Sequence, residues 1–396
     1  MRYVSRTAAL AVASCLLAIA CTPPDPPAGA GDPTPKPTVQ RARAPTPTPQ
    51  PIRTAEPRQN NLPTPVAQTP TDIRVTQVVD GLQLPAALAF APDGRLFFNE
   101  IQKGMVRILD ASGVLQDEPF ETLKISRRKE HGVLGLALDP DFATNHYVYV
   151  FYSQAANNGV DPDDNRIVRF TERDGLAHNR TIIRENLPIG ICCHNGGRLA
   201  FGPDGKLYVT VGDQNQAERA QQPNRLNGKI LRLNPDGTLP SDNPLPNSPV
   251  FALGFRNPYG LDFHPLTGVP YVTENGEEGH DEVNRVVAGG NYGSPEMDGI
   301  VNDPRFVDPV WESGLGRLAP TGAAFYTGQA MPEYTHDLFF CAFVTGDLTR
   351  IRLGGPSLDQ VAEQGVVAKD CYLDVVNSPD GSLYFTSITA IHRFGR

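Results

Sequence analysis

The sequence predicts an all-β protein, a six-bladed β-propeller with four-stranded antiparallel blades. Three observations predict this fold class. A strand–turn–strand unit recurs at roughly 50 to 60 residues along the chain. The strands of the unit are short and alternate apolar with polar residues, and helical periodicity is almost absent. A pair of β-sandwiches is the runner-up, but it does not explain the repeat.

The recurring unit joins an apolar strand to an alternating strand through a turn that contains proline. Its clear copies begin at Leu88, Leu136, Leu199, Leu261 and Val375. Their turn prolines are Pro92, Pro140, Pro203, Pro265 and Pro379. The last interval is about twice as long as the others, so we expect a degenerate sixth unit between Ala323 and Leu353.

We expect the two ends of the domain to complete one blade together. An N-terminal segment, Ile73 to Val78, and a C-terminal segment, Ala390 to Phe394, both read as strands. Pairing them closes the ring and leaves neither strand with a free edge. The propeller domain is therefore expected to span residues 72–396.

Residues 1–20 are typical of a lipoprotein signal peptide. Arg2 and Arg6 precede an apolar run that ends at Ala20 and is shorter than the ~20 residues that cross a bilayer. The following Cys21 completes a sequence that resembles a bacterial lipobox, which predicts its lipidation. A competing box ends at Cys15, and ordinary cleavage or a retained anchor are the alternatives.

The next segment, residues 21–71, is dominated by Pro, Thr, Ala and Gln. It has too few large apolar side chains to offset the entropy of ordering, so we expect an extended, disordered tether. Together the two segments predict export to the cell envelope, periplasmic or extracytoplasmic. The membrane is then a partner only through the lipid anchor.

Charge and cysteine content limit the partners and the compartment. The formal net charge of -9 and the pI near 5.4 argue against nucleic acid as a partner. Four cysteines lie in the domain, and in an oxidising compartment they allow three disulfide connectivities. These disulfide candidates are Cys192, Cys193, Cys341 and Cys371.

A histidine and an aspartate stand at opposite ends of one recurring unit. His194 precedes the first strand, and Asp213 follows the second strand after the turn at Pro203. If the strands pair as a hairpin, both polar side chains emerge at the same end of the sheet. This arrangement predicts a catalytic dyad, because neither residue is needed for the core or for the turn.

Three other segments place polar residues at the ends of predicted strands. The first is Glu130 to Gly135, the second is Gly254 to Gly260, and the third is the acidic stretch Glu274 to Asn284. A Gly-Gly-Asn-Tyr-Gly sequence follows at Gly289. With these segments the chain resembles the glucose/sorbosone dehydrogenase family, from about Gly81 to the C-terminus. The motifs that carry the resemblance are HxGGRLxFGPDGxLYxxxGDQ, LGxRNPxG, DEVN and GGNYGxP.

The resemblance implies pyrroloquinoline quinone (PQQ) and calcium as cofactors. It matches His194 to the family's general base, Asp213 to the partner of that base, and Arg256 to an electrophilic support. The residues expected to lie beside the cofactor are Asn257, Asn275 and Glu130, the last in place of a glutamine. The base would take a hydroxyl proton while hydride leaves a sugar hemiacetal for the quinone.

The resemblance also implies two calcium sites in the acidic stretch. The carbonyl groups of Gly276 and Glu277 would hold the calcium ion that touches the quinone, while Glu282 and Tyr292 match a separate structural site. Hard cations prefer such oxygen ligands. The alternative is a solvated acidic turn, since the spacing is not that of an EF-hand.

The sequence departs from the family where cations face the cofactor carboxylates. The matching positions hold Val344, Cys371 and Leu373. The possible substitutes are Arg317, Arg350, Arg352 and Lys369, although Arg350 and Arg352 alternate as an outward strand face does. Near this region we expect a bridge from Cys192 or Cys193 to Cys341 or Cys371, or a vicinal bridge between Cys192 and Cys193.

These observations predict a PQQ-dependent aldose-type sugar dehydrogenase. It would oxidise a sugar hemiacetal to the lactone and pass electrons to a partner such as a cytochrome or a quinone. The alternative is a non-enzymatic propeller that binds carbohydrate or another ligand with calcium and has lost PQQ. A calcium lactonase is a weaker third hypothesis, because it needs a metal-bound water beside the acidic residues.

Overall fold

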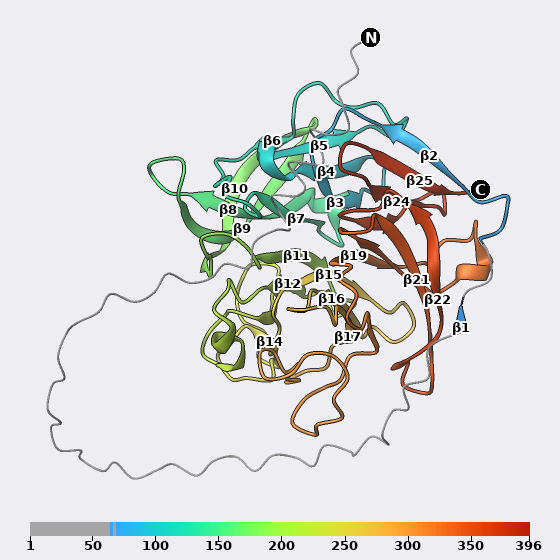
Figure 1. The fold of residues 1–396 in the computed structure, drawn as a ribbon. Coiled ribbons are helices and arrows are strands. Elements are labelled where there is room, and N and C mark those ends of the chain that lie inside the picture. Colours follow the sequence, from blue (N-terminus) through green and yellow to red (C-terminus); the bar gives the residue numbers. More distant parts are fainter. Residues whose placement is uncertain (1–63, 66–68) are drawn as a thin grey trace, which may run out of the picture. The chain divides into compact units, whose positions relative to one another are not determined.

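The structure, a computed structural model, describes residues 64–65 and 69–396 (Figure 1). The predicted signal peptide, the lipidated Cys21 and nearly all of the predicted tether lie outside the described residues. The segment Gln59–Arg396 forms one compact unit. In the part of the chain that is described, no helix has the length and apolar character needed to cross a membrane.

The unit is a β-propeller of six blades, each with four antiparallel strands, as the sequence predicts. The first blade consists of β3 (Pro85–Phe90), β4 (Leu96–Glu100), β5 (Met105–Leu109) and β6 (Glu121–Thr122). The second consists of β7 (Val133–Leu138), β8 (Tyr147–Ala155), β9 (Pro162–Arg173) and β10 (Leu176–Leu187). The third consists of β11 (Gly196–Phe201), β12 (Leu207–Val211), β13 (Lys229–Leu233) and β14 (Val250–Leu253).

The last three blades complete the ring. The fourth blade consists of β15 (Pro258–Phe263), β16 (Pro270–Glu274), β17 (Glu282–Arg285) and β18 (Trp311–Glu312). The fifth consists of β19 (Pro320–Phe325), β20 (Leu338–Ala342), β21 (Asp347–Gly354) and β22 (Gln360–Lys369), and β1 (Thr64–Pro65) pairs in parallel with β22. The sixth consists of β23 (Val375–Asn377), β24 (Leu383–Thr386), β25 (Ile391–Gly395) and β2 (Arg74–Val79). The short helices are η1 (Ile101–Lys103), α2 (Phe142–Asn145), η2 (Ala217–Gln221) and η3 (Pro332–Tyr334).

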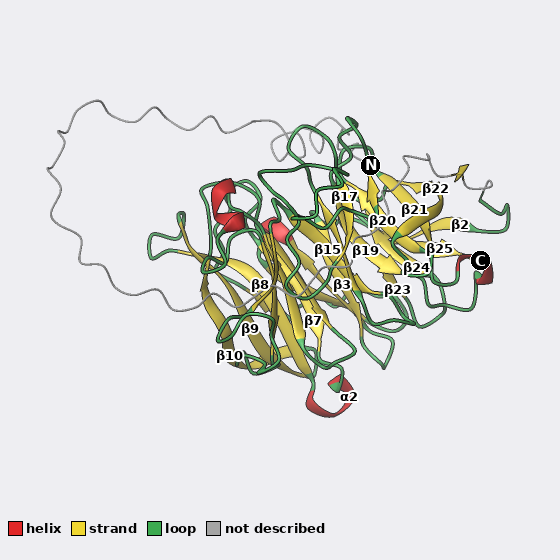
Figure 2. Ribbon diagram, turned by 90° about the horizontal axis from the view of Figure 1, so that it is seen from below, coloured by secondary structure: helices red, strands yellow, loops and turns green. Residues whose placement is uncertain are grey.

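The innermost strands pack side by side around the centre of the ring. They are β3, β7, β11, β15, β19 and β23, and β23 returns to β3 (Figures 1 and 2). The last blade closes the ring as predicted, because the N-terminal strand β2 pairs with the C-terminal strand β25, with Val75 opposite Phe394. In Figure 1 these are the blue and red strands at the two ends of the sequence.

Each predicted recurring unit is the hairpin of an innermost strand and the second strand of its blade. The sixth, degenerate unit is the hairpin β19–β20. In each antiparallel hairpin the start of the inner strand lies opposite the end of the second strand, as Gly196 lies opposite Val211 and Pro258 opposite Glu274. The segments before the inner strands and after the second strands therefore gather at one face of the propeller, which we call the site face.

The core lies between neighbouring blades and is rich in aromatic side chains. Phe97 of the first blade packs edge-on against Phe142 of the second, and Tyr271 of the fourth packs in the same way against Phe325 of the fifth. All four rings are almost completely buried. Such burial contributes roughly 1.5 to 3 kcal/mol for each large side chain. Packing blade on blade thus makes the ring rigid and fixes the loops on the site face.

Candidate active site

The predicted dyad forms on the site face. The Nδ1 atom of His194 lies 2.7 Å from Oδ1 of Asp213, which also accepts a hydrogen bond from the backbone amide of Asn215 at 2.7 Å. Asp213 is buried, whereas the His194 side chain keeps a small exposed part. A carboxylate at Nδ1 selects the imidazole tautomer that carries its proton there. The lone pair of Nε2 is then left for a proton from a bound molecule.

The chain holds His194 in an unusual backbone conformation. Its φ angle of 57° is in the left-handed region, and its backbone amide donates to Oε2 of Glu130 at 2.8 Å. The opposite strand approaches closely, because a Cβ atom at Gly212 would lie 2.1 Å from the His194 carbonyl oxygen. Glycine at this position therefore permits the approach that brings the histidine and the aspartate together.

Asp213 is fixed by groups that the sequence analysis missed. Its carbonyl oxygen accepts a hydrogen bond from Nδ2 of Asn227 at 3.1 Å, and Nζ of the buried Lys229 donates to the Asn227 carbonyl at 2.7 Å. Lys229 also donates to the carbonyl of Ala220 at 2.7 Å, and burial lowers its pKa to about 7. A lysine at the start of the apolar strand Lys229–Leu233 is the one sequence signal from which a buried, structural role could have been predicted.

Arg256 and Asn257 lie beside the dyad. The Arg256 carbonyl accepts the backbone amide of Asp213 at 2.7 Å, and Nη1 of Arg256 donates to the carbonyl of Asn275 at 3.0 Å. Asn257 accepts the backbone amide of Gly196 at 3.3 Å. The Oδ1 atom of Asn275 is buried and has no hydrogen-bond partner within the described chain, which is costly unless a ligand donates to it.

Glu130 supports the histidine from the neighbouring blade. Besides holding the His194 amide, its carboxyl group lies near the positive charges of Arg256 and Lys129. Burial raises the pKa of Glu130, and these charges oppose the rise. The residue was predicted to contact a cofactor, and its hydrogen bond gives it a second task, because it positions His194.

The acidic stretch is tied to the loop before β19 by one carboxylate. Asp281 is buried, and its Oδ1 accepts the amide of Gly276 at 3.0 Å. Its Oδ2 accepts the amides of Leu318 and Ala319 at 2.6 and 2.9 Å. The side chains of Glu277 and Glu278 are exposed. The Glu277 carbonyl, a predicted calcium ligand, accepts a hydrogen bond from Nη2 of Arg317 at 2.9 Å.

Both residues of the second predicted calcium pair also make hydrogen bonds within the protein. Oε1 of Glu282 accepts the amide of Gly299 at 2.8 Å, and burial raises the pKa of Glu282 to about 7. The Tyr292 hydroxyl donates to the Arg285 carbonyl at 2.8 Å, and its ring stacks on Phe255. In residues 69–396, no group of three or more His, Cys, Asp or Glu side chains is arranged to hold a metal ion. Calcium at Glu282 and Tyr292 stays a prediction, while the Glu277 carbonyl already accepts a hydrogen bond from Arg317.

Comparison with known proteins shows the family. The model of the family described as glucose/sorbosone dehydrogenase matches residues 82–390. The chain belongs to the glucose/sorbosone dehydrogenase family. It is 29% identical over 336 residues to an aldose sugar dehydrogenase of Escherichia coli (strain K12), covering 80% of this chain and 90% of the relative. Family membership supports a sugar oxidoreductase.

Solved structures of the same kind share the fold. A putative oxidoreductase (glucose dehydrogenase) from Thermus thermophilus is 35% identical, with a TM-score of 0.74, and the match covers 81% of this chain and 99% of that one. The PQQ-bound aldose sugar dehydrogenase of Streptomyces coelicolor is 28% identical, with a TM-score of 0.72 and coverage of 83% and 99%. The similarity thus extends over the propeller as a whole.

Two of the positions where the family has cationic side chains lie on the site face, but in this chain they carry no charge. Val344 is 43% exposed after β20, and Leu373 is buried before β23. Most of the proposed substitutes are paired elsewhere: Arg350 and Arg352 bind Asp337 and Glu363, and Lys369 binds Asp347. The interpretation of Arg350 as a solvated outward residue was wrong, because its guanidinium is buried between these carboxylates. Among the four substitutes, Arg317 contacts the acidic stretch.

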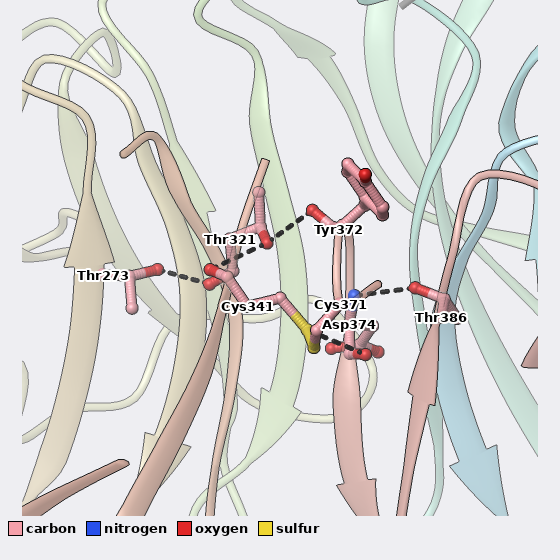
Figure 3. The surroundings of a disulfide bond; sticks show 7 residues. All are labelled: Thr273, Thr321, Cys341, Cys371, Tyr372, Asp374 and Thr386. Atoms are coloured by element: carbon pink, nitrogen blue, oxygen red, sulfur yellow. Dashed lines mark hydrogen bonds between the residues drawn. A yellow bond between two sulfur atoms is a disulfide. The ribbon is translucent and has the colours of Figure 1, made fainter. Parts of the chain in front are cut away.

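The disulfide differs from the predicted bridges. Cys341 bonds to Cys371, with Cα atoms 4.9 Å apart, and joins β20 to the segment that leads into β23 (Figure 3). The predicted bridges from these residues to Cys192 or Cys193 were wrong, because the blades place Cys341 beside Cys371. Cys192 and Cys193 form no disulfide, and their sulfur atoms lie 3.0 and 3.4 Å from Nδ2 of Asn215.

Hydrogen bonds fix the surroundings of the disulfide. The Thr321 hydroxyl donates to the carbonyl oxygens of Cys341 and Tyr372 at 3.2 and 2.9 Å, so one side chain holds both bridged segments (Figure 3). The Thr273 hydroxyl in turn donates to the Thr321 carbonyl at 2.6 Å. Both sulfur-bearing residues are fully buried, so the bridge braces the blades behind the site face.

Proposed function

We propose that this protein is a PQQ-dependent aldose-type sugar dehydrogenase that oxidises a sugar hemiacetal to the lactone. The observation that carries the proposal is the 2.7 Å contact between His194 and Asp213 beside Arg256, on the site face of a glucose/sorbosone dehydrogenase propeller. The PQQ-bound relative from Streptomyces coelicolor supports the choice of cofactor. The partly exposed imidazole beside a buried carboxylate is the arrangement of a general base.

His194 is the general base. Asp213 holds the Nδ1 proton and stabilises the imidazolium that forms, so that Nε2 takes the proton of the C1 hydroxyl group. When bound, PQQ supplies the acceptor for the two electrons and the hydrogen that leave C1 as hydride. Arg256 places a positive charge next to the dyad, where it stabilises negative charge that develops during the reaction.

The residues present fit a quinone on the dyad side of the site. Asn275 has a buried Oδ1 atom without a partner in the described residues, and Arg256 supplies charged N–H donors beside it. Asn257 uses its Oδ1 atom to accept the amide of Gly196. Charged donors match anionic oxygen atoms of the cofactor. On the opposite side, Val344 and Leu373 offer no charge. Calcium at Glu282 and Tyr292 stays a prediction.

Reconstitution tests the proposal. The purified full chain is titrated with PQQ, followed by quenching of its tryptophan fluorescence, and then supplied with a dye acceptor and a panel of aldoses. We expect saturable binding, dye reduction, and formation of lactone. His194→Ala should abolish turnover, whereas His178→Ala, a change at an exposed histidine of β10, should not. If the His194→Ala variant still turns over sugar, His194 is not the general base.

The alternative is a non-enzymatic propeller that binds carbohydrate or another ligand. The uncharged positions Val344 and Leu373 favour it, because a tricarboxylate needs cations in a desolvated site. Failure to bind PQQ in the titration, with sugar binding retained in calorimetry, would select this alternative over the enzyme.

We also propose that the protein is exported and tethered by a lipid at Cys21. The support is the sequence of residues 1–20, and the disulfide between Cys341 and Cys371 suits an oxidising compartment. Incorporation of a labelled fatty acid tests it. We expect label in the wild-type chain and none in Cys21→Ala; equal labelling of Cys15→Ala and wild type would exclude the competing lipobox.

A further inference from the structure

One guanidinium group contacts a carbonyl group that family resemblance assigns to calcium. Nη2 of Arg317 lies 2.9 Å from the carbonyl oxygen of Glu277. The side chain of Arg317 is exposed on the site face. Within residues 69–396 its hydrogen-bond partner is thus a neutral carbonyl group and not a carboxylate, so its charge is not neutralised by that contact.

The loop that carries Arg317 is fastened to the loop that carries Glu277. The buried Asp281 carboxylate accepts the amide of Gly276 on one loop and the amides of Leu318 and Ala319 on the other. The His280 amide also donates to the Gly314 carbonyl at 2.5 Å. Because these contacts lie on both sides of Arg317, they fix the backbone from which its side chain reaches the Glu277 carbonyl.

The chemistry of the two cations is similar enough for one to replace the other. A calcium ion takes carbonyl oxygens as ligands and attracts the anionic oxygens of a bound molecule. A guanidinium donates to a carbonyl oxygen and keeps several N–H donors for a carboxylate or a quinone oxygen. The guanidinium of Arg317 takes one of the two lone pairs of the Glu277 carbonyl oxygen, and its positive charge repels a calcium ion that approaches the same oxygen.

We propose that Arg317 is the resident cation of this site and takes the place of the calcium ion. It satisfies the Glu277 carbonyl and offers its remaining donors to an anionic ligand, a quinone with carboxylate groups. Loading of the ligand is therefore independent of calcium. The identity of the ligand rests on the proposed function, whereas the exclusion of calcium by Arg317 does not.

Calcium binding is the first measurement. The full chain, freed of divalent ions, is titrated with calcium chloride in a calorimeter. We expect Arg317→Ala to bind one more calcium ion per chain than the wild type, because the Glu277 carbonyl becomes available. Arg305→Ala is the matched control, since Arg305 is exposed and pairs with Asp303 and Glu296. Equal stoichiometry in Arg317→Ala and wild type would overturn the proposal.

PQQ binding is the second measurement, made by fluorescence titration with excess EDTA or with excess calcium. The wild type should bind equally well in both. Arg317→Ala should bind roughly tenfold to a hundredfold more weakly in EDTA and recover with calcium. A wild type that requires calcium overturns the proposal. If neither protein binds PQQ, the proposed function fails, and the calcium titration alone decides the role of Arg317.

Discussion

Two regions of the site face are built from different chemistry. The dyad side, formed by the hairpins β11–β12 and β15–β16, brings together His194, Asp213 and Arg256 through two hydrogen bonds of 2.7 Å. The disulfide side, formed by β20 and the segment before β23, carries Val344, the Cys341–Cys371 bridge and Leu373. One side holds charge and proton-transfer groups, and the other holds apolar and covalent contacts.

The reactive end of the site and its binding end are therefore held in place by different interactions. The dyad side needs its geometry held to a fraction of an ångström, and Glu130, Asn227 and Lys229 hold it. The disulfide side keeps its shape through a bridge and through the Thr321 hydroxyl. If the disulfide side has no share in chemistry, changes there affect stability or affinity, while changes on the dyad side affect turnover.

The largest expected effect is on the dyad side. Asp213→Asn keeps the size of the side chain but offers its amide to Nδ1, so the imidazole loses the tautomer that leaves Nε2 as an acceptor. We expect kcat to fall roughly 10²- to 10⁴-fold, measured as dye reduction with saturating sugar. An unchanged melting temperature is the control for folding. A variant with wild-type kcat would break the assignment of chemistry to this side.

The disulfide side should respond in stability. Replacing Cys341 and Cys371 together with alanine opens a loop with a sequence separation of 30 residues. We expect the free energy of unfolding to fall by about 3 kcal/mol, measured by urea denaturation. PQQ binding and kcat at a temperature well below the transition should stay within about twofold of wild type. Loss of turnover in the folded double variant would contradict the separation.

Acid should destabilise the blade that supports the dyad. Burial lowers the pKa of His131 from 6.5 to about 4, so the folded protein binds fewer protons than the unfolded chain between these values. The free energy of unfolding is therefore lost as pH falls from about 6.5 to 4, by up to about 3 kcal/mol. His131→Asn should flatten this slope in denaturation curves. A variant with the wild-type slope would assign the acid sensitivity to other groups.

The smallest expected effect comes from returning a charge to the disulfide side. Val344→Lys places an ammonium group at an exposed position, where a charge pair is worth about 0.2 to 1 kcal/mol. We expect a modest, salt-sensitive gain in PQQ affinity, measured by fluorescence titration at low and high ionic strength. Val366→Lys, at another exposed valine, is the control. Equal gains in both variants would show a non-specific effect of net charge.

Much of the fold was accessible from the sequence. The repeat of turn prolines such as Pro203 and Pro265 marks hairpins because proline and glycine restrict the backbone locally. The pairing of β2 with β25 also followed from the need to close the ring. The dyad was predictable for the same reason, since a single hairpin places His194 and Asp213 at one end of its sheet.

The rest depended on contacts between blades. Three features depend on how different strands and loops pack together. They are the bridge between Cys341 and Cys371, the burial of Arg350 beside Asp337, and the contact of Arg317 with Glu277. Sequence spacing gives no measure of such contacts. The position of Lys229 in an apolar strand could have indicated that it is buried. Its three carbonyl partners could not have been predicted.

The repeat, the closure of the ring and the residue types of the dyad can be read from the sequence, because they follow from local backbone preferences and strand periodicity. The cation that contacts the Glu277 carbonyl and the cysteines that form the disulfide become known only from the packing of the blades. Asp281 shows the physical reason. Its carboxylate, one of several in the acidic stretch, becomes a brace between two loops because the fold brings three backbone amides to it.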